Sequence, residues 1–326
     1  MASRWLFPAM ALLGVLLAAG CTATPPRAPA PRLERPLVVP VAWEKDGLVV
    51  HASVNGSAPL PFIFDSGLSE IHVLSRETAR RLGVEGRGWS MAGSWSGYAS
   101  TSFAEVDELE LGGLRFGRTP VAIMDLPESV TARKEGPPLA GFLGQPLFRP
   151  YAVTVDVAAG TLTLSQDHEP PAGAVVLPIR MRGGLPRVPA RFGEASLQLD
   201  VDTGDFGEVT LYENAARRLR VLRRYGPGEV RGAVAAGGPF NYIAVRADGF
   251  RLGVLSFDDL ELHVAPFGVA AAMKEDGTVG MGLLGRFRFT LDQPAGRLVL
   301  EPRCAAGGGG AGELRCDPSV EPGGGR

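Results

Sequence analysis

The sequence has little excess charge of either sign. Lysine and arginine number 33, aspartate and glutamate number 35, and the formal net charge over 326 residues is −2. It contains no basic block that could hold phosphates, so the charge pattern gives no case for nucleic-acid binding. Histidine is also scarce, with four residues and neither an H-E-x-x-H motif nor a paired spacing. We therefore predict no metal site.

Aromatic residues are sparse as well, at 7 % of the chain, whereas glycine (44) and proline (27) are abundant. This balance predicts many turns and short strands rather than long helices. Hydrophobic residues make up 45 % of the chain, which is enough for a sizeable core. The length suits two ordinary domains.

The N-terminus reads as an export signal rather than as part of the fold. Arg4 precedes an apolar segment at 5–19 that is too short for a comfortable membrane span. It ends in Leu-Ala-Ala-Gly-Cys, which resembles a bacterial lipobox and implies that residues 1–21 are a lipoprotein signal peptide with Cys21 lipidated. An ordinary signal peptide with an incidental cysteine is the alternative. The Ala/Pro-rich residues 22–36 read as a tether, so we expect a lipid-anchored protein of the bacterial cell envelope.

Two further cysteines lie near the C-terminus. Cys304 and Cys316 flank a glycine run at 307–310, in a compartment that permits disulfides. We predict a disulfide between them, with two free surface thiols as the alternative. Residues 304–326 otherwise read as a glycine-rich tail.

An internal duplication organises the remainder. Residues 65–84 align without a gap to residues 202–221, including a shared Ala-Arg-Arg-Leu block. Further matching blocks follow in the same order in both halves: 111–116 with 252–257, 141–144 with 282–285, and 154–164 with 290–300. Repeated order of this kind indicates two equivalent units. We predict one lobe at 37–168 and a second at 170–303, joined at the Pro-Pro-Ala-Gly of 170–173.

Each half reads mainly as strands, which predicts an all-β fold with one short helix per lobe. Apolar and β-branched residues predict strands at 48–54 and 60–64, with the Asn55-Gly56 turn between them, and alternation predicts another strand at 197–201. Ser75 can cap a helix at 76–82, which Gly83 would end, and 213–219 is its counterpart.

One tripeptide recurs at equivalent places in the two halves. Asp65-Ser66-Gly67 follows the first apolar strand, and Asp202-Thr203-Gly204 follows its counterpart. A single tripeptide of this kind most often marks only a turn. Here an apolar-apolar-Gly element ending at Gly144 or Gly285 follows each copy at a similar distance. This arrangement favours a functional role for the tripeptides over a simple turn.

This pattern resembles the pepsin and retropepsin clan of aspartic proteases over residues 37–302. The resemblance implies two pseudo-symmetric lobes with the active site in the cleft between them, and Asp65 and Asp202 as the catalytic pair. It also implies supporting residues around that pair: the hydroxyls of Ser66 and Thr203 bonding across the lobes, Gly67 and Gly204 allowing close approach, and Gly144 and Gly285 bracing the loops.

The activity implied is hydrolysis of peptide bonds in a peptide or protein substrate without a cofactor. Two carboxyl groups that share one proton can supply both the base and the acid that this reaction needs. The alternative is a non-catalytic peptide-binding or assembly module on the same fold. Because both half-sites lie in one chain, we expect a monomer.

The resemblance also implies a hairpin that closes over the substrate. Residues 86–102 are rich in glycine and serine, with Trp95 and Tyr98 as candidate flap residues, and 226–242 is the counterpart in the second lobe. An ordinary surface hairpin with core aromatics is the alternative.

Overall fold

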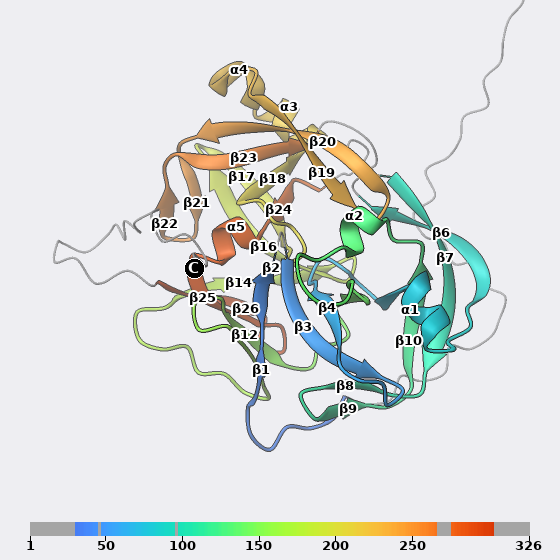
Figure 1. The fold of residues 1–326 in the computed structure, drawn as a ribbon. Coiled ribbons are helices and arrows are strands. Elements are labelled where there is room, and N and C mark those ends of the chain that lie inside the picture. The colour runs from blue at the N-terminus through green and yellow to red at the C-terminus, as the bar shows by residue number, and fades with distance from the viewer. Residues whose placement is uncertain (1–29, 45–46, 95–96, 266–274, 303–326) are drawn as a thin grey trace, which may run out of the picture.

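The computed structural model describes residues 30–44, 47–94, 97–265 and 275–302 (Figure 1). The chain is mostly β-structure in two pseudo-symmetric lobes, which confirms the predicted fold class. The signal segment, Cys21, Trp95, Cys304, Cys316 and the C-terminal tail lie outside the described residues, as does most of the predicted tether.

The first lobe is built on a ten-stranded sheet. In spatial order its strands are β6 (Arg87–Ser94), β7 (Gly97–Val106), β10 (Thr119–Met124), β5 (His72–Ser75), β11 (Gly141–Leu143), β4 (Leu60–Phe64), β3 (Gly47–Val54), β8 (Leu109–Leu111) and β9 (Leu114–Phe116), with β2 (Ala42–Glu44) paired to β3.

The second lobe repeats this sheet strand for strand. Its order is β19 (Glu229–Ala235), β20 (Gly238–Ala247), β23 (Leu260–Ala265), β18 (Val209–Tyr212), β24 (Gly277–Val279), β17 (Ala195–Val201), β16 (Leu185–Phe192), β21 (Phe250–Leu252) and β22 (Leu255–Phe257), with β15 (Arg180–Arg182) paired to β16. The duplication seen in the sequence is therefore a duplication of topology.

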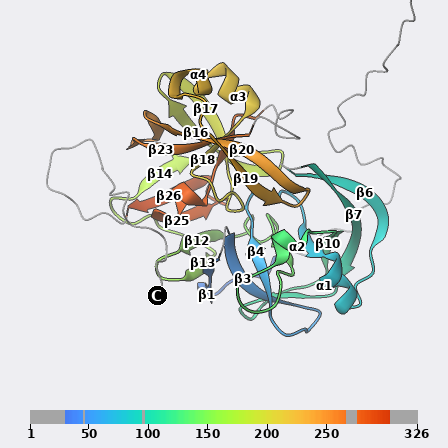
Figure 2. The same ribbon diagram turned by 45° about the horizontal axis from the view of Figure 1, so that its top comes forward.

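A six-stranded sheet joins the two halves (Figure 2). Its order is β1 (Leu37–Pro40), β13 (Thr161–Ser165), β12 (Ala152–Asp156), β25 (Phe287–Asp292), β26 (Arg297–Pro302) and β14 (Val175–Pro178). The seam is the antiparallel pair β12–β25, where the buried hydroxyls of Thr154 and Thr290 lie 2.7 Å apart in a hydrogen bond.

The described helices are all short: α1 (Arg76–Arg81), α2 (Glu128–Thr131), α3 (Glu213–Arg218), α4 (Val221–Tyr225) and α5 (Met281–Leu284). The predicted helices are α1 and α3, and α2, α4 and α5 are additional to the one short helix per lobe that was predicted. Ser75 caps α1 as predicted, accepting a hydrogen bond from the Thr78 amide, and Gly83 follows with a φ of 66°. No helix in the described part of the chain is both long enough and apolar enough to span a membrane.

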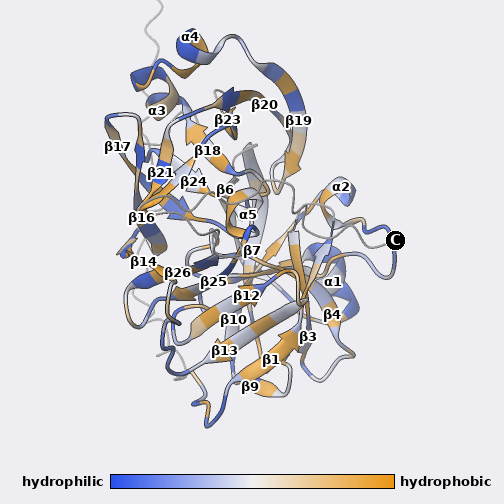
Figure 3. Cartoon of the chain, turned by 90° about the vertical axis from the view of Figure 1, so that its left-hand side faces the viewer, coloured by the Kyte–Doolittle hydropathy of each residue, from blue (hydrophilic) through white to orange (hydrophobic). Residues whose placement is uncertain are grey.

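The strands that lead to the Asp-containing tripeptides are held by the core on one face. Phe62 and Phe64 of β4, and Leu199 and Val201 of β17, are fully buried in the same main cluster. The turn between β3 and β4 sets how these two strands pair. Asn55 (φ 50°) and Gly56 (φ 72°) both adopt the left-handed conformation of a tight hairpin turn. Figure 3 shows orange, hydrophobic segments along the sheets and blue, hydrophilic segments on the outlying α4.

Candidate active site

Asp65 and Asp202 stand directly after the buried strands β4 and β17. A short parallel strand fixes each backbone: the Asp65 amide donates to the carbonyl of Leu143 (2.9 Å), and the Asp202 amide donates to that of Val279 (3.0 Å). Since β11 and β24 are themselves central in their sheets, both aspartates sit on rigid elements.

Each carboxylate is turned by its own tripeptide. The Gly67 amide donates to Asp65 Oδ1 and the Gly204 amide donates to Asp202 Oδ1, both at 2.8 Å. Both turns therefore use the same hydrogen bond. The two loops hold their carboxyl groups in equivalent orientations, as the duplication implies.

Ser66 and Thr203 tie the two loops together. Ser66 Oγ donates to the carbonyl of Val201 and Thr203 Oγ1 donates to that of Phe64, each at 2.7 Å. In return, each hydroxyl oxygen accepts from the backbone amide of the other residue at 2.9 Å. Both side chains are fully buried, so these four hydrogen bonds form a closed cross-lobe lock without access to water.

The glycines of the tripeptides bring the carboxyl groups together. A Cβ on Gly67 would lie 2.4 Å from Asp202 Oδ1, and a Cβ on Gly204 would lie 2.6 Å from Asp65 Cγ. These separations are shorter than any tolerated contact, so only glycine lets each loop pack against the opposite carboxyl group. The two carboxyl groups share a side-chain hydrogen bond.

Burial makes ionisation of this pair costly. Burial, partly opposed by hydrogen bonds from Gly67, Asp202 and Leu68, raises the pKa of Asp65 to about 6. The pKa of Asp202 lies well above its usual value, first because of burial and then because of the negative charges of Asp65 and Asp205. Two adjacent carboxyl groups in this setting hold one proton between them near neutral pH.

Gly144 follows β11 and lies against the first loop, and its structural equivalent in the second lobe is Gly280, which follows β24. A Cβ on Gly144 would lie 2.7 Å from the carbonyl oxygen of Leu68, and one on Gly280 would lie 2.6 Å from that of Asp205. The prediction of Gly285 for this role is wrong. Gly285 instead ends α5, donating its amide to the carbonyl of Met281. An apolar-apolar-Gly pattern also closes a short helix, and this similarity misaligned the repeat.

Two nearby residues were not found from the sequence. Gln145 is fully buried; its Nε2 donates to the carbonyl of Ser66 (2.6 Å), while its Oε1 accepts from Gln293 Nε2 (2.6 Å). Asp205 is also buried, with Oδ1 accepting from the Gly207 amide and Oδ2 from the hydroxyls of Thr210 and Thr278. The sequence signal that could have found Gln145 is its position, since it is a polar residue directly after Gly144.

The two predicted flaps are the hairpins β6–β7 and β19–β20. Their tips approach each other, because a Cβ on Gly97 would lie 3.8 Å from the carbonyl oxygen of Gly237. Ala236 of the second hairpin also packs against a small apolar cluster of the first lobe, and this cluster includes Ala99 of the first hairpin. The Tyr98 side chain is 63 % exposed and does not fill the core.

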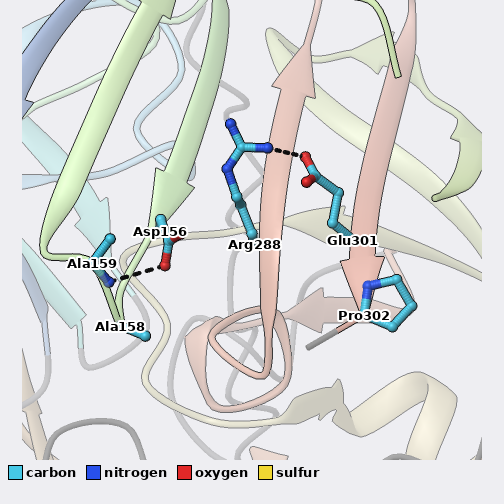
Figure 4. Close-up of a pocket in the computed structure, with 6 residues that line it drawn as sticks. All are labelled: Asp156, Ala158, Ala159, Arg288, Glu301 and Pro302. Carbon is cyan, nitrogen blue, oxygen red and sulfur yellow. Dashed lines mark hydrogen bonds and ion pairs between the residues drawn. The ribbon is translucent and has the colours of Figure 1, made fainter. Parts of the chain in front are cut away.

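Two cavities lie away from these aspartates. One, of about 500 Å³, opens on the six-stranded sheet between Asp156, Arg288 and Glu301, where the last two form an ion pair (Figure 4). The other, of about 260 Å³, lies near His72 and Arg149. No group of three or more potential metal ligands gathers anywhere in residues 30–302 that the structure describes.

Comparison with known proteins is consistent with this geometry. Residues 50–147 match a family model described as "Aspartyl protease". The match includes the Asp65 tripeptide, β11 and Gly144, and stops before the second lobe. It supports an aspartyl protease family for the chain. No curated protein matches it.

Proposed function

We propose that this chain is an aspartic endopeptidase in which Asp65 and Asp202 activate one water between them. The observation that carries the proposal is the reciprocal packing of each carboxyl group against the glycine of the opposite loop. That packing brings a partly buried acid, Asp65, and a buried acid, Asp202, from different lobes into one hydrogen-bonded pair. The family match over the first lobe supports the same reaction.

In the proposed reaction the ionised carboxylate removes a proton from water, and the resulting hydroxide attacks the peptide carbonyl carbon. The protonated carboxyl group donates its proton to the carbonyl oxygen, which gives a neutral tetrahedral diol. The carboxyl group that received the proton from water then donates it to the peptide nitrogen, while the other carboxylate accepts a proton from a diol hydroxyl, and the carbon–nitrogen bond breaks. One product carries the new amino group and the other carries the new carboxyl group, and the pair of aspartates again holds a single proton.

The neighbouring charges favour Asp65 as the base in the free protein. Asp202 faces the negative charges of Asp65, Asp205 and Asp200, all of which raise its pKa. Asp65 has an added amide donor, Leu68, which stabilises its ionised form. Asp202 therefore retains the shared proton and acts as the acid.

The two hairpins fit the role of paired flaps in this proposal. Their tips adjoin at Gly97 and Gly237, so a substrate would enter beneath them after the tips separate. Closure would then exclude bulk water from the acids, which strengthens their electrostatic action.

A mixed-peptide cleavage assay with a statine-type inhibitor tests the proposal. We expect cleavage at acidic to neutral pH that the inhibitor blocks and that Asp202→Asn abolishes. Asp156→Asn is the matched control, because Asp156 is an aspartate of the six-stranded sheet outside the tripeptides. Inhibitor binding without cleavage at any pH would favour the non-catalytic peptide-binding or assembly module.

We further propose that the protein acts at the bacterial cell envelope, anchored through a lipid on Cys21. This rests on the signal segment and the lipobox-like residues of the sequence. An anchored endopeptidase of this kind would act on peptides or proteins within reach of its Ala/Pro-rich tether.

A further inference from the structure

The residue two positions before each catalytic aspartate lies on the same face of its strand. Side chains alternate along β4 and β17, so Ile63 accompanies Asp65, and Asp200 accompanies Asp202. The intervening Phe64 and Val201 point into the main core. Ile63 and Asp200 thus flank the catalytic pair on its two sides, one from each lobe.

The first-lobe flank is apolar. Val49 pairs with Ile63 across β3–β4, and both pack with Leu139 in a separate small cluster. Phe142 is partly buried against this cluster. A substrate side chain on this side of the scissile bond meets hydrocarbon.

The second-lobe flank is ionic at the same three positions. Arg187 pairs with Asp200 across β16–β17, as Val49 does with Ile63. Glu275 is the counterpart of Leu139, since the next residue in each lobe, Asp276 or Ala140, accepts the equivalent backbone hydrogen bond from Tyr212 or Ser75. The three equivalent positions therefore hold an apolar trio in the first lobe (Val49, Ile63 and Leu139) and a charged trio in the second (Arg187, Asp200 and Glu275).

The charged trio is bonded internally but unbalanced. Arg187 Nε donates to Asp200 Oδ1 (2.7 Å) and Arg187 Nη2 donates to Asp200 Oδ2 (3.2 Å), whereas Glu275 Oε1 lies 3.8 Å from Nη2. The side chains of Arg187 and Asp200 are 10 % and 5 % exposed, while that of Glu275 is 36 % exposed. One cation faces two carboxylates, and the second carboxylate is the accessible one.

We propose that the enzyme selects peptides with an apolar side chain on the Ile63 side of the scissile bond and a lysine or arginine on the Asp200 side. This rests on the proposed endopeptidase function. An incoming cation completes the charge balance at Glu275, whereas an acidic side chain is repelled. An apolar side chain would cover the ion pair without any compensating contact.

Synthetic peptides that differ only at the two residues around the scissile bond test this inference. The pairs are Leu–Arg, Arg–Leu, Leu–Leu, Leu–Glu and Glu–Leu in one common frame. We expect one of the two Leu/Arg orders to be cleaved about tenfold faster, in kcat/KM, than Leu–Leu, and both Glu peptides to be slower still.

The variant Glu275→Gln should lose most of the preference for arginine over leucine. Glu194→Gln is the matched control, because Glu194 lies in the same lobe with its side chain fully exposed. It should leave the preference unchanged. Fastest cleavage of Leu–Leu by the wild type, or an unchanged preference in Glu275→Gln, would overturn the inference.

Binding separates this inference from the proposed function. Fluorescence anisotropy with the same peptides and the Asp202→Asn protein should rank a Leu/Arg peptide tightest even without turnover. If the wild type cleaves nothing but this ranking persists, the catalytic proposal fails and the recognition proposal stands. Equal binding of all five peptides would overturn the recognition proposal whether or not cleavage occurs.

Discussion

The cross-lobe lock predicts a large and specific loss of stability in Thr203→Val. Valine matches threonine in shape but removes the hydroxyl, which donates to the Phe64 carbonyl and accepts from the Ser66 amide. Both orphaned groups stay buried, and an unsatisfied buried group costs about 1–3 kcal/mol. We therefore expect the free energy of unfolding to fall by about 2–6 kcal/mol.

Urea unfolding followed by circular dichroism measures this loss. The matched control is Thr154→Val, which removes one buried hydroxyl–hydroxyl bond to Thr290 at the other seam between the halves. It should cost about 1–2 kcal/mol and leave peptide cleavage near wild type. Thr203→Val should lower cleavage strongly even at temperatures where it is folded, because the lock positions both loops.

Ser66→Ala completes the test through a double-mutant cycle. Ser66 and Thr203 each make two of the four hydrogen bonds, and all four hold the same pair of loops together. A loop pair already loosened by one change has less to lose from the other, so the double variant should lose less stability than the sum of the two single losses. Losses below about 0.5 kcal/mol for Thr203→Val, or strict additivity in the cycle, would refute the lock.

Four further predictions follow from the same geometry. Gly204→Ala places a Cβ 2.6 Å from Asp65 Cγ and should abolish cleavage, whereas Gly117→Ala, which meets nothing within 4 Å, should not; normal activity of Gly204→Ala would contradict the packing. Because the pKa of Asp65 is raised from 3.8 to about 6, the folded protein holds this proton more tightly than the unfolded chain does. The free energy of unfolding should therefore fall as the pH rises from about 4 to about 6, by up to about 3 kcal/mol for this group, and Asp65→Asn should flatten that fall in urea titrations at each pH. Asp205→Asn removes a charge that raises the pKa of Asp202, so the alkaline limb of the kcat profile should move to lower pH, and an unmoved limb would exclude this role. Cys21→Ala should release the protein from the membrane fraction, as followed by immunoblotting of cell fractions, and unchanged membrane retention would rule out the lipid anchor.

The duplication made much of this fold predictable. Local patterns were sufficient for the β3–β4 hairpin at Asn55-Gly56 and for the helix capped by Ser75, because turn and capping chemistry act within a few residues. The equivalence of Asp65 and Asp202 followed from their place in the repeat. It predicted that both would follow an apolar strand, as they do.

The misplaced glycine shows where such patterns stop being sufficient. Gly280 is placed beside the second loop by the pairing of the three-residue strand β24 with β17, a contact between segments about eighty residues apart. Nothing local distinguishes it from Gly285, which closes α5. The charged trio was missed for the same reason, since Arg187 and Glu275 meet Asp200 only through sheet register.

The most direct test of the central claim is the cleavage rate of Asp65→Asn, Asp202→Asn and the double variant against the wild type. If the two carboxyl groups act as one unit, each single variant should lose nearly as much kcat as the double variant, with folding verified by urea unfolding. A single variant that keeps wild-type kcat, or losses that multiply independently in the double variant, would contradict a shared dyad.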